Sequence, residues 1–174
     1  MAHYVRYLVF LTAVFLTAVM VWNTGLAEER QISVEIVDWG LTSPKEVGSE
    51  VSPDTPTGVN RLVEGPVDVT RTTKIRACIG TSFGVLYRTS DVGEAVLPIM
   101  VVVFHPMIKT LDGRSMLKSS WPDSATSLRR YAGWVFERDF ELVSGEWTIS
   151  LRDQSGRELV SKSFDVTAGS CPIS

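Results

Sequence analysis

The sequence predicts an all-β fold, an antiparallel β-sandwich of about seven to eight strands. Short runs of β-branched and aromatic residues recur along most of the 174 residues, and Gly, Pro, Asp or Ser follows each run. Several runs alternate apolar and polar residues, as a strand with one buried face requires. No long amphipathic helix and no internal repeat breaks this pattern. Strand number and turn spacing of this kind are typical of immunoglobulin-like sandwiches.

The first 27 residues have the composition of a signal peptide. Arg6 is the one strongly charged residue among them, and an apolar run, Leu8–Trp22, follows it. The small residues Gly25 and Ala27 come next, directly before the charged stretch EER. Because the apolar run is shorter than the roughly 20 residues of a bilayer span, we expect a signal-peptide helix that is cleaved after Ala27.

Cleavage would leave a single β-sandwich domain, residues 28–174, with its core over 31–167. The expected location is the periplasm or the cell exterior. The alternative is an uncleaved N-terminal anchor, which would be the only contact with a membrane that we expect.

The charge of the chain argues against nucleic acid as a partner. The sequence has 17 basic and 20 acidic residues, whereas a nucleic-acid surface needs a basic footprint. The exported part holds one histidine, His105, and two cysteines, which is too few for a zinc cluster. We therefore expect neither a metal nor a cofactor.

Four runs are predicted to be strands with one buried face. Their buried residues are expected to be Ile32, Val34 and Ile36 in residues 31–38; Ile75, Ala77 and Ile79 in 72–80; Ala132, Trp134 and Phe136 in 131–140; and Trp147, Ile149 and Leu151 in 146–153. A short strand over 83–88 follows the second run, and 157–167 is the last strand.

The strand over 96–105 is apolar on both faces, so both faces should be covered. Pro98 belongs at its start or on an edge, because proline cannot donate a ladder hydrogen bond. We expect the connection 106–130 to cover the second face as a lid, with one or two helical turns in 124–130; a functional loop is the alternative. The segment 40–66, rich in Pro, Gly, Ser and Thr, is expected to be surface loop with at most a short strand.

The closing hairpin has the sharpest pattern, F-x-L-x-x-G-x-W in residues 140–147. Gly145 allows a tight corner before the penultimate strand. Trp147 then buries its ring and can use its indole N–H to fasten that corner.

Five stretches together resemble an uncharacterised bacterial family of exported, single-domain immunoglobulin-like β-sandwich proteins, a domain of unknown function. They are ISVEIVDWG, TTKIRACIGTSFGVLYR, VVVFHP, Y-x-x-W-x-F and SGEWTISLRDQSGRELVSKSFDV, and the resemblance covers residues 32–166. It implies the fold and export, and it brings no activity, cofactor or catalytic residue.

Residues 80–84 read G-x-S-x-G, the pattern of a hydrolase nucleophile elbow, with Asp91 and His105 downstream of Ser82. Such an elbow needs a helix after the serine, whereas FGVLYR consists of strand formers. The triad candidates are also too close in sequence for the large sheet of that enzyme class. We interpret the motif as a hairpin turn bounded by glycines.

Other candidate residues have a functional and a structural interpretation. Trp39, His105 and Trp121 are possible ligand contacts, or else a strand-end histidine and tryptophans that cap the core. The pair Arg129 and Arg130 could hold an anion or form a solvated strand entry. Glu137 and Asp139 are interpreted as a solubilising surface.

Cys78 and Cys171 are predicted to form an intramolecular disulfide, because an even pair in an exported domain is usually bonded. Alternation places Cys78 on the face away from the core, and the bond would fasten the C-terminal tail. The rival interpretation is a covalent dimer through Cys171.

The function expected from the sequence is a non-catalytic extracytoplasmic module that binds a protein or peptide partner, or has a structural role in the bacterial envelope. The first alternative is a small-ligand or carbohydrate-binding domain, and a small serine hydrolase is the last. A free sheet edge or an exposed apolar patch favours the protein-binding module. A concave pocket with converging polar groups favours the small-ligand-binding domain. A hydrogen bond between Ser82 and His105 favours the hydrolase.

Overall fold

Nine strands in two sheets make up the described part of the chain, residues 33–90 and 96–171 of a computed structural model. These residues belong to the unit Gln31–Ser174. The predicted signal peptide with its cleavage site, Ile32 and Asp91 lie outside the described residues. Within the described ranges, no helix is long and apolar enough to cross a membrane.

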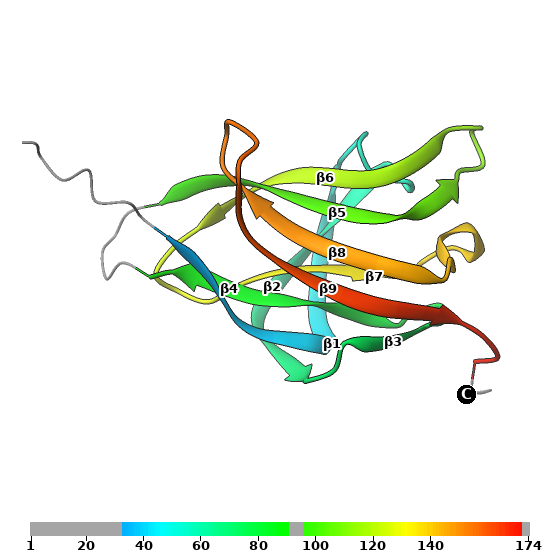
Figure 1. Ribbon diagram of the computed structural model, residues 1–174, viewed down its shortest axis with the longest axis horizontal. Coiled ribbons are helices and arrows are strands. Elements are labelled where there is room, and N and C mark those ends of the chain that lie inside the picture. The colour runs from blue at the N-terminus through cyan, green and yellow to red at the C-terminus, as the bar shows by residue number, and fades with distance from the viewer. Residues whose placement is uncertain (1–32, 91–95, 172–174) are drawn as a thin grey trace, which may run out of the picture. The chain divides into compact units, whose positions relative to one another are not determined.

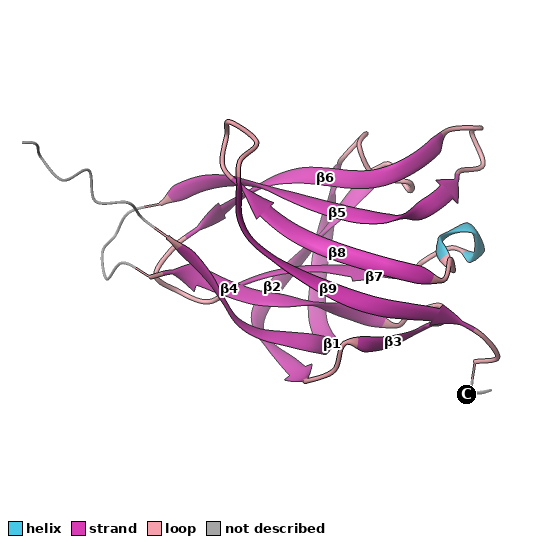
Figure 2. Ribbon diagram, in the orientation of Figure 1, coloured by secondary structure: helices cyan, strands magenta, loops and turns pink. Residues whose placement is uncertain are grey.

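The strands are β1 (Val34–Val51), β2 (Val59–Thr70), β3 (Lys74–Ala77), β4 (Ser82–Thr89), β5 (Leu97–Lys109), β6 (Ser115–Ala125), β7 (Arg130–Val135), β8 (Gly145–Arg152) and β9 (Glu158–Ala168). A short 3-10 turn, η1 (Asp139–Glu141), lies between β7 and β8. One sheet has the order β2-β1-β4-β7, and the other has the order β3-β9-β8-β5-β6 (Figures 1 and 2). The β3–β9 pair is parallel and the other pairs are antiparallel. The predicted all-β sandwich is confirmed.

The core lies between the two sheets and is rich in aromatic rings. Phe83 of β4 lies 5.0 Å from Phe164 and 5.9 Å from Trp147 between ring centroids, which joins the sheets through edge contacts. The indole N–H of Trp147 donates to the carbonyl of Val143 at 3.2 Å, so the predicted corner is formed. Gly145 has φ +137°, and a Cβ there would lie 2.7 Å from Pro106.

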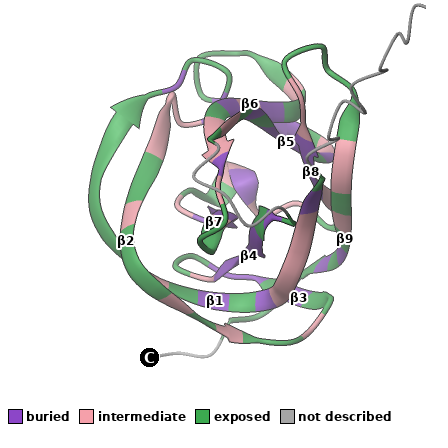
Figure 3. Cartoon of the chain, turned by 90° about the vertical axis from the view of Figure 1, so that its left-hand side faces the viewer, coloured by how far each residue is buried: buried purple, intermediate pink, exposed green. Residues whose placement is uncertain are grey.

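The predicted loop over 40–66 is wrong, because most of it forms the long β1–β2 hairpin. Its apolar residues are sparse and its side chains are mostly exposed, so hydrophobic alternation does not reveal it (Figure 3). The pairing of β1 with β2 shifts register at two points, between Ser43 and Lys45 and between Glu46 and Gly48. The first shift lets the strand accommodate Pro44, which has no N–H to donate.

The predicted lid over 106–130 is also wrong. That segment continues β5 and returns as β6, which pairs beside β5 at the edge of the sheet. The second face of β5 therefore stays partly open: Met100 and Phe104 are each 37% exposed, and the Arg152 guanidinium lies 5.2 Å from the Phe104 ring centroid. Residues 124–130 contain no helical turn, since β6 ends and β7 begins there. Pro98 lies second in β5, near the strand's start as expected.

Cys78 and Cys171 form the predicted intramolecular disulfide, which ties the tail after β9 to the end of β3. Cys78 is 8% exposed and does not belong to the main core cluster, which includes its neighbours Ile75 and Ala77. The expected burial of Ile79 is wrong, since it is 53% exposed. The reason is that β3 ends at Ala77 and the chain turns toward Gly80, so strand alternation no longer applies.

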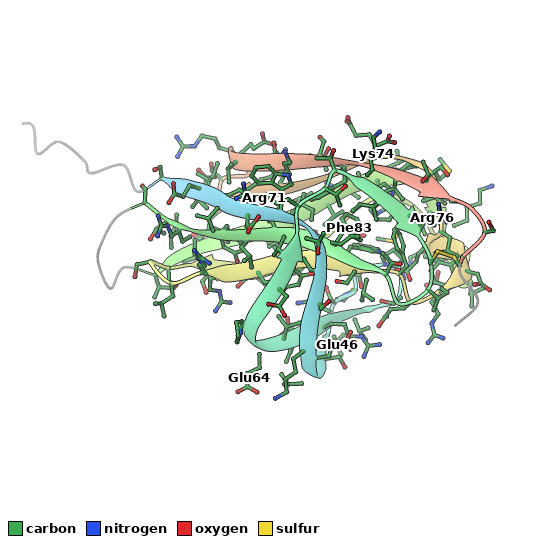
Figure 4. All side chains as sticks on the ribbon, turned by 90° about the horizontal axis from the view of Figure 1, so that it is seen from below. Glu46, Glu64, Arg71, Lys74, Arg76 and Phe83 are labelled. Carbon is green, nitrogen blue, oxygen red and sulfur yellow. A yellow bond between two sulfur atoms is a disulfide. The ribbon has the colours of Figure 1, made fainter. Side chains whose placement is uncertain are left out.

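The distal part of the β1–β2 hairpin, residues 44–63, is called the arm below. It leaves the sandwich as a two-stranded ribbon, and Glu46 projects from it (Figure 4). Its tip docks on the other sheet: the backbone N–H of Ser120 in β6 donates to Asp54 O at 3.1 Å, and Arg114 Nη1 donates to Pro53 O at 2.8 Å. The arm therefore bridges the two sheets on the side where β7 and β6 are their edge strands.

Candidate ligand-binding cavity

Ser82 lies in β4, and no basic side chain or carboxylate among the described residues is hydrogen-bonded to its hydroxyl. Its hydroxyl is hydrogen-bonded to Thr42 Oγ1 at 2.9 Å and to the Tyr131 hydroxyl at 3.1 Å. His105 lies in the other sheet, where Nε2 pairs with Ser119 Oγ at 3.0 Å and Nδ1 pairs with Pro106 O at 2.8 Å. The described residues thus contain no Ser82–His105 hydrogen bond.

The glycines around Ser82 have two different roles. Gly80 has φ +84° and forms the turn between β3 and β4. Gly84 lies inside β4, opposite Gly133 of β7, so the hairpin-turn interpretation is wrong for Gly84 and for Ser82. The Tyr131 ring covers both glycines: a Cβ on Gly84 would lie 2.6 Å from Tyr131 Cε2, and one on Gly133 would lie 1.9 Å from its hydroxyl oxygen. A Cβ on Gly84 would also lie 2.5 Å from Ala132 O, so Gly84 makes room for both the tyrosine ring and the backbone of β7.

A cavity of about 350 Å³ lies between the arm and the two edge strands β7 and β6. All six residues of β7, Arg130–Val135, line it. β6 contributes Trp121, Pro122 and Asp123, and the arm contributes residues along both of its strands. Because β7 and β6 are sheet edges, the arm closes the open side of the sandwich over this space (Figure 3).

Trp134 lines the cavity with an unsatisfied donor. The residue is 7% exposed. Among the buried side-chain nitrogen and oxygen atoms of the described part of the chain, Trp134 Nε1 is the one without a hydrogen-bond partner. Its ring packs against His105 and Trp147, with centroids 5.7 Å and 5.2 Å away. Buried polar groups in native proteins are nearly always paired, so this indole N–H requires an explanation.

Glu141 lines the same cavity and is 2% exposed. Its Oε2 accepts the backbone N–H groups of Glu137 and Arg138, each at 2.8 Å. No described residue donates to its second oxygen, Oε1. Burial raises the pKa of the Glu141 carboxyl to about 7, although the two backbone hydrogen bonds oppose that rise.

Charged side chains surround the cavity and are mostly acidic. Arg130 Nη2 donates to Asp123 at 2.5 Å, and Arg61 of the arm pairs with Glu137. The sequence interpretation of Glu137 as a solubilising surface residue is therefore incomplete, because Glu137 also pairs with Arg61 of the arm. The five lining carboxyl groups outnumber the two arginines; they belong to Glu46, Glu50, Asp123, Glu137 and Glu141.

The residues predicted from the sequence are only partly brought together. Trp121 lines the cavity, whereas Trp39 lies in β1 with the Lys162 ammonium 4.1 Å and the Arg71 guanidinium 4.8 Å from its ring centroid. His105 is 5% exposed and contacts Trp134 from inside the core. Arg130 lines the cavity and Arg129 does not.

Sequence reasoning missed Trp134, Glu141 and the arm as parts of a site. Trp134 was expected in the core, and its burial gives no sign of an unpaired N–H. Glu141 lies in the stretch RDFELV, where nothing distinguishes a buried carboxyl from a surface one. No cluster of His, Cys, Asp and Glu that could hold a metal ion occurs in residues 33–90 and 96–171.

Fold and comparisons together define an immunoglobulin-like β-sandwich protein. The crystal structure of an immunoglobulin-like protein from Pseudomonas aeruginosa is similar, with 24% sequence identity, a TM-score of 0.53, and coverage of 79% of this chain and 99% of that chain. Residues 30–166 match the family described as a domain of unknown function (DUF3859), and the chain belongs to that family. No curated protein matches the chain.

Proposed function

We propose that this protein is a non-catalytic, exported binding module whose ligand occupies the cavity between the arm and strands β7 and β6. The observation that carries the proposal is the buried, unpartnered indole N–H of Trp134, a residue that lines that cavity. A ligand that accepts this hydrogen bond removes the cost of an unsatisfied buried donor, about 1–3 kcal/mol.

The dimensions and lining of the cavity support a small ligand. Its volume of about 350 Å³ lies at the lower end of the range of small-molecule sites. Aromatic side chains, Trp121 and Tyr131, stand beside the polar groups of Glu141 and Trp134, and such a mixture of apolar walls and converging polar groups is typical of ligand pockets.

The surroundings of Ser82 support a role without catalysis. Its hydroxyl holds Tyr131 and Thr42, and its expected base is committed to Ser119 in the other sheet. The disulfide supports export, because such bonds persist in oxidising compartments.

A second candidate is a peptide that adds a strand to β7. The observation that favours it is that β7 is an edge strand whose six residues all line the cavity. Extended peptides commonly bind to such edges through backbone hydrogen bonds. The arm covers this edge, however, so a peptide would need the arm to open, whereas a small molecule would not.

The proposal is tested by isolating the protein without denaturation from the envelope fraction of its host and weighing it by native mass spectrometry. We expect a bound small molecule in the natural protein and none in Val63→Phe, which fills the cavity from the arm. The matched control is Val67→Phe, on the same strand but outside the cavity lining, which should keep the molecule. A peptide mass would favour the second candidate. Absence of any ligand, or equal retention in both variants, would contradict the proposal.

A further inference from the structure

We propose that the ligand of this cavity is a small organic cation that also carries a hydrogen-bond acceptor, with its ammonium group at Glu141 and its acceptor at Trp134. The inference rests on the proposed function and specifies the class of ligand. Three observations support it: the unpartnered Trp134 Nε1 together with Glu141 Oε1, to which no described residue donates, the excess of carboxylates, and the aromatic walls.

Trp134 Nε1 and Glu141 Oε1 have complementary hydrogen-bonding properties. Trp134 Nε1 can only donate a hydrogen bond, and Glu141 Oε1, when ionised, can only accept one or attract positive charge. Both residues are more than nine-tenths buried and line the same space. A single ligand with a cation and an oxygen acceptor satisfies both groups, whereas a neutral apolar ligand satisfies neither.

The charges around the cavity exclude an anion as the preferred ligand. Both lining arginines already have carboxylate partners, Asp123 for Arg130 and Glu137 for Arg61. Glu46 and Glu50 are less closely paired: Arg61 Nε forms a longer ion pair with Glu46 at 3.9 Å, and Glu50 accepts a hydrogen bond from the neutral amide of Asn60. Because the lining carboxyl groups outnumber the arginines, an anion would enter an excess of negative charge, and a cation would reduce that excess.

The aromatic side chains of the lining favour the same class. Trp121 of β6 and two residues of β7, Tyr131 and Trp134, all line the cavity. Indole and phenol faces attract cations, and ammonium groups are commonly held between aromatic rings and a carboxylate. The carboxylates would select a ligand with a positive charge, and the Trp134 N–H would select a ligand with a hydrogen-bond acceptor.

The test compares four small compounds by chemical-shift titration of the 15N-labelled protein, with the Trp134 indole N–H and the backbone amides of β7, which remain in every variant, as reporters. Choline has a permanent cation and a hydroxyl group. Its carbon isostere 3,3-dimethyl-1-butanol lacks the charge, 3,3-dimethylbutanoate is an anion, and tetramethylammonium lacks the acceptor. We expect choline to bind about tenfold or more tightly than its neutral isostere and severalfold more tightly than tetramethylammonium.

Variants assign that preference to residues. Glu141→Gln should abolish the advantage of choline over its isostere, and Trp134→Phe should abolish its advantage over tetramethylammonium. The matched controls lie outside the cavity lining and should change neither ratio. They are Glu64→Gln, at an exposed position of β2 (Figure 4), and Trp39→Phe in β1. If Glu141→Gln fails to fold, the double variant Glu46→Gln and Glu50→Gln changes only exposed arm residues and should weaken choline binding severalfold.

The outcomes separate this inference from the proposed function. If the isostere or the carboxylate shifts the cavity resonances as strongly as choline, the cavity binds ligands but the cationic class is wrong. If no compound shifts the Trp134 resonance and no molecule co-purifies, the indole N–H is satisfied by water only, and both proposals fail.

Discussion

The rings of Trp134 and Trp147 pack edge to face, 5.2 Å apart, yet only one of the two indole N–H groups has a partner. Trp147 donates to Val143 O and fastens the corner before β8. Trp134 faces the edge of the sandwich, where the arm and the strands β6 and β7 enclose a cavity. The same residue type thus serves the core at one position and the candidate site at the other.

This difference predicts unequal costs of substitution. Trp147→Phe loses a hydrogen bond as well as packing and should lower the free energy of unfolding by about 1–3 kcal/mol. Trp134→Phe loses no hydrogen bond and should cost at least about 1 kcal/mol less. Urea denaturation of both variants measures the difference. Equal costs would mean that the Trp134 N–H has a partner within the folded chain.

The contact of Tyr131 with the glycine pair predicts that Gly133 does not tolerate a side chain. Gly133→Ala should destabilise the fold by about 1–3 kcal/mol or more, because the new Cβ would collide with the Tyr131 ring. Gly48→Ala is the control, since the nearest atom to its Cβ would be 3.9 Å away. In a Tyr131→Ala background the Gly133→Ala cost should fall but not vanish, because the new Cβ would still lie 2.6 Å from Phe83 O. An unchanged cost there would mean that the ring is not part of the cause.

Ser82→Ala should cost about 1 kcal/mol of stability and leave any ester hydrolysis unchanged, because the hydroxyl orders Tyr131 and Thr42. The sequence alone predicts almost no loss of stability, since it places Ser82 in a turn. Thermal denaturation and an ester-hydrolysis screen measure the two effects. Turnover that disappears with this substitution would restore the hydrolase interpretation.

The disulfide predicts a large loss of stability when both cysteines are replaced by serine. The bond closes a separation of 93 residues, and chain entropy gives an upper figure of roughly 4–5 kcal/mol for such a loop. The natural protein should migrate as a monomer on gels with and without reductant. A dimer band that vanishes with reductant would indicate bonding between chains instead.

Much of the fold follows from the sequence because strands that bury one face leave a period-two pattern. The stretches around Ile75, Trp134 and Trp147 are examples, and all of their predicted buried residues except Ile79 are found in the core. The arm leaves no such pattern, since backbone pairing and its docked tip hold it rather than burial of alternating side chains.

The candidate site was harder to predict for two physical reasons. It joins segments that are far apart in the chain, such as Arg61 and Glu137, so no local motif contains it. Its most informative groups also depend on the absence of a partner, as at Trp134 Nε1, and only a three-dimensional arrangement reveals an unpaired atom. The disulfide could be predicted from the sequence alone, because two cysteines allow one intramolecular pairing.

The buried carboxyl of Glu141 predicts a fall in stability between pH 5 and pH 7. Its pKa is raised in the folded protein to about 7 from an ordinary 4.5, so its contribution is fully present below the ordinary value and is lost as pH rises through the folded one. The loss should be roughly 1–3 kcal/mol. Burial lowers the pKa of His105, which acts in the opposite direction over nearly the same range.

The difference between the natural protein and Glu141→Gln isolates the Glu141 contribution. The variant should gain stability relative to the natural protein as pH rises from 5 to 7.5, because the His105 contribution is common to both. Urea denaturation across this range gives the difference curve. A flat curve would mean that Glu141 has an ordinary pKa in the folded state.

A crystal structure of the protein soaked with choline tests the central claim most directly, namely that the cavity beneath the arm is a ligand-binding site. We predict density for the compound between Glu141 and Trp134, with its oxygen within about 3 Å of Trp134 Nε1. A cavity that contains only water at saturating choline, together with no retained molecule in the protein isolated from its host, would contradict the account.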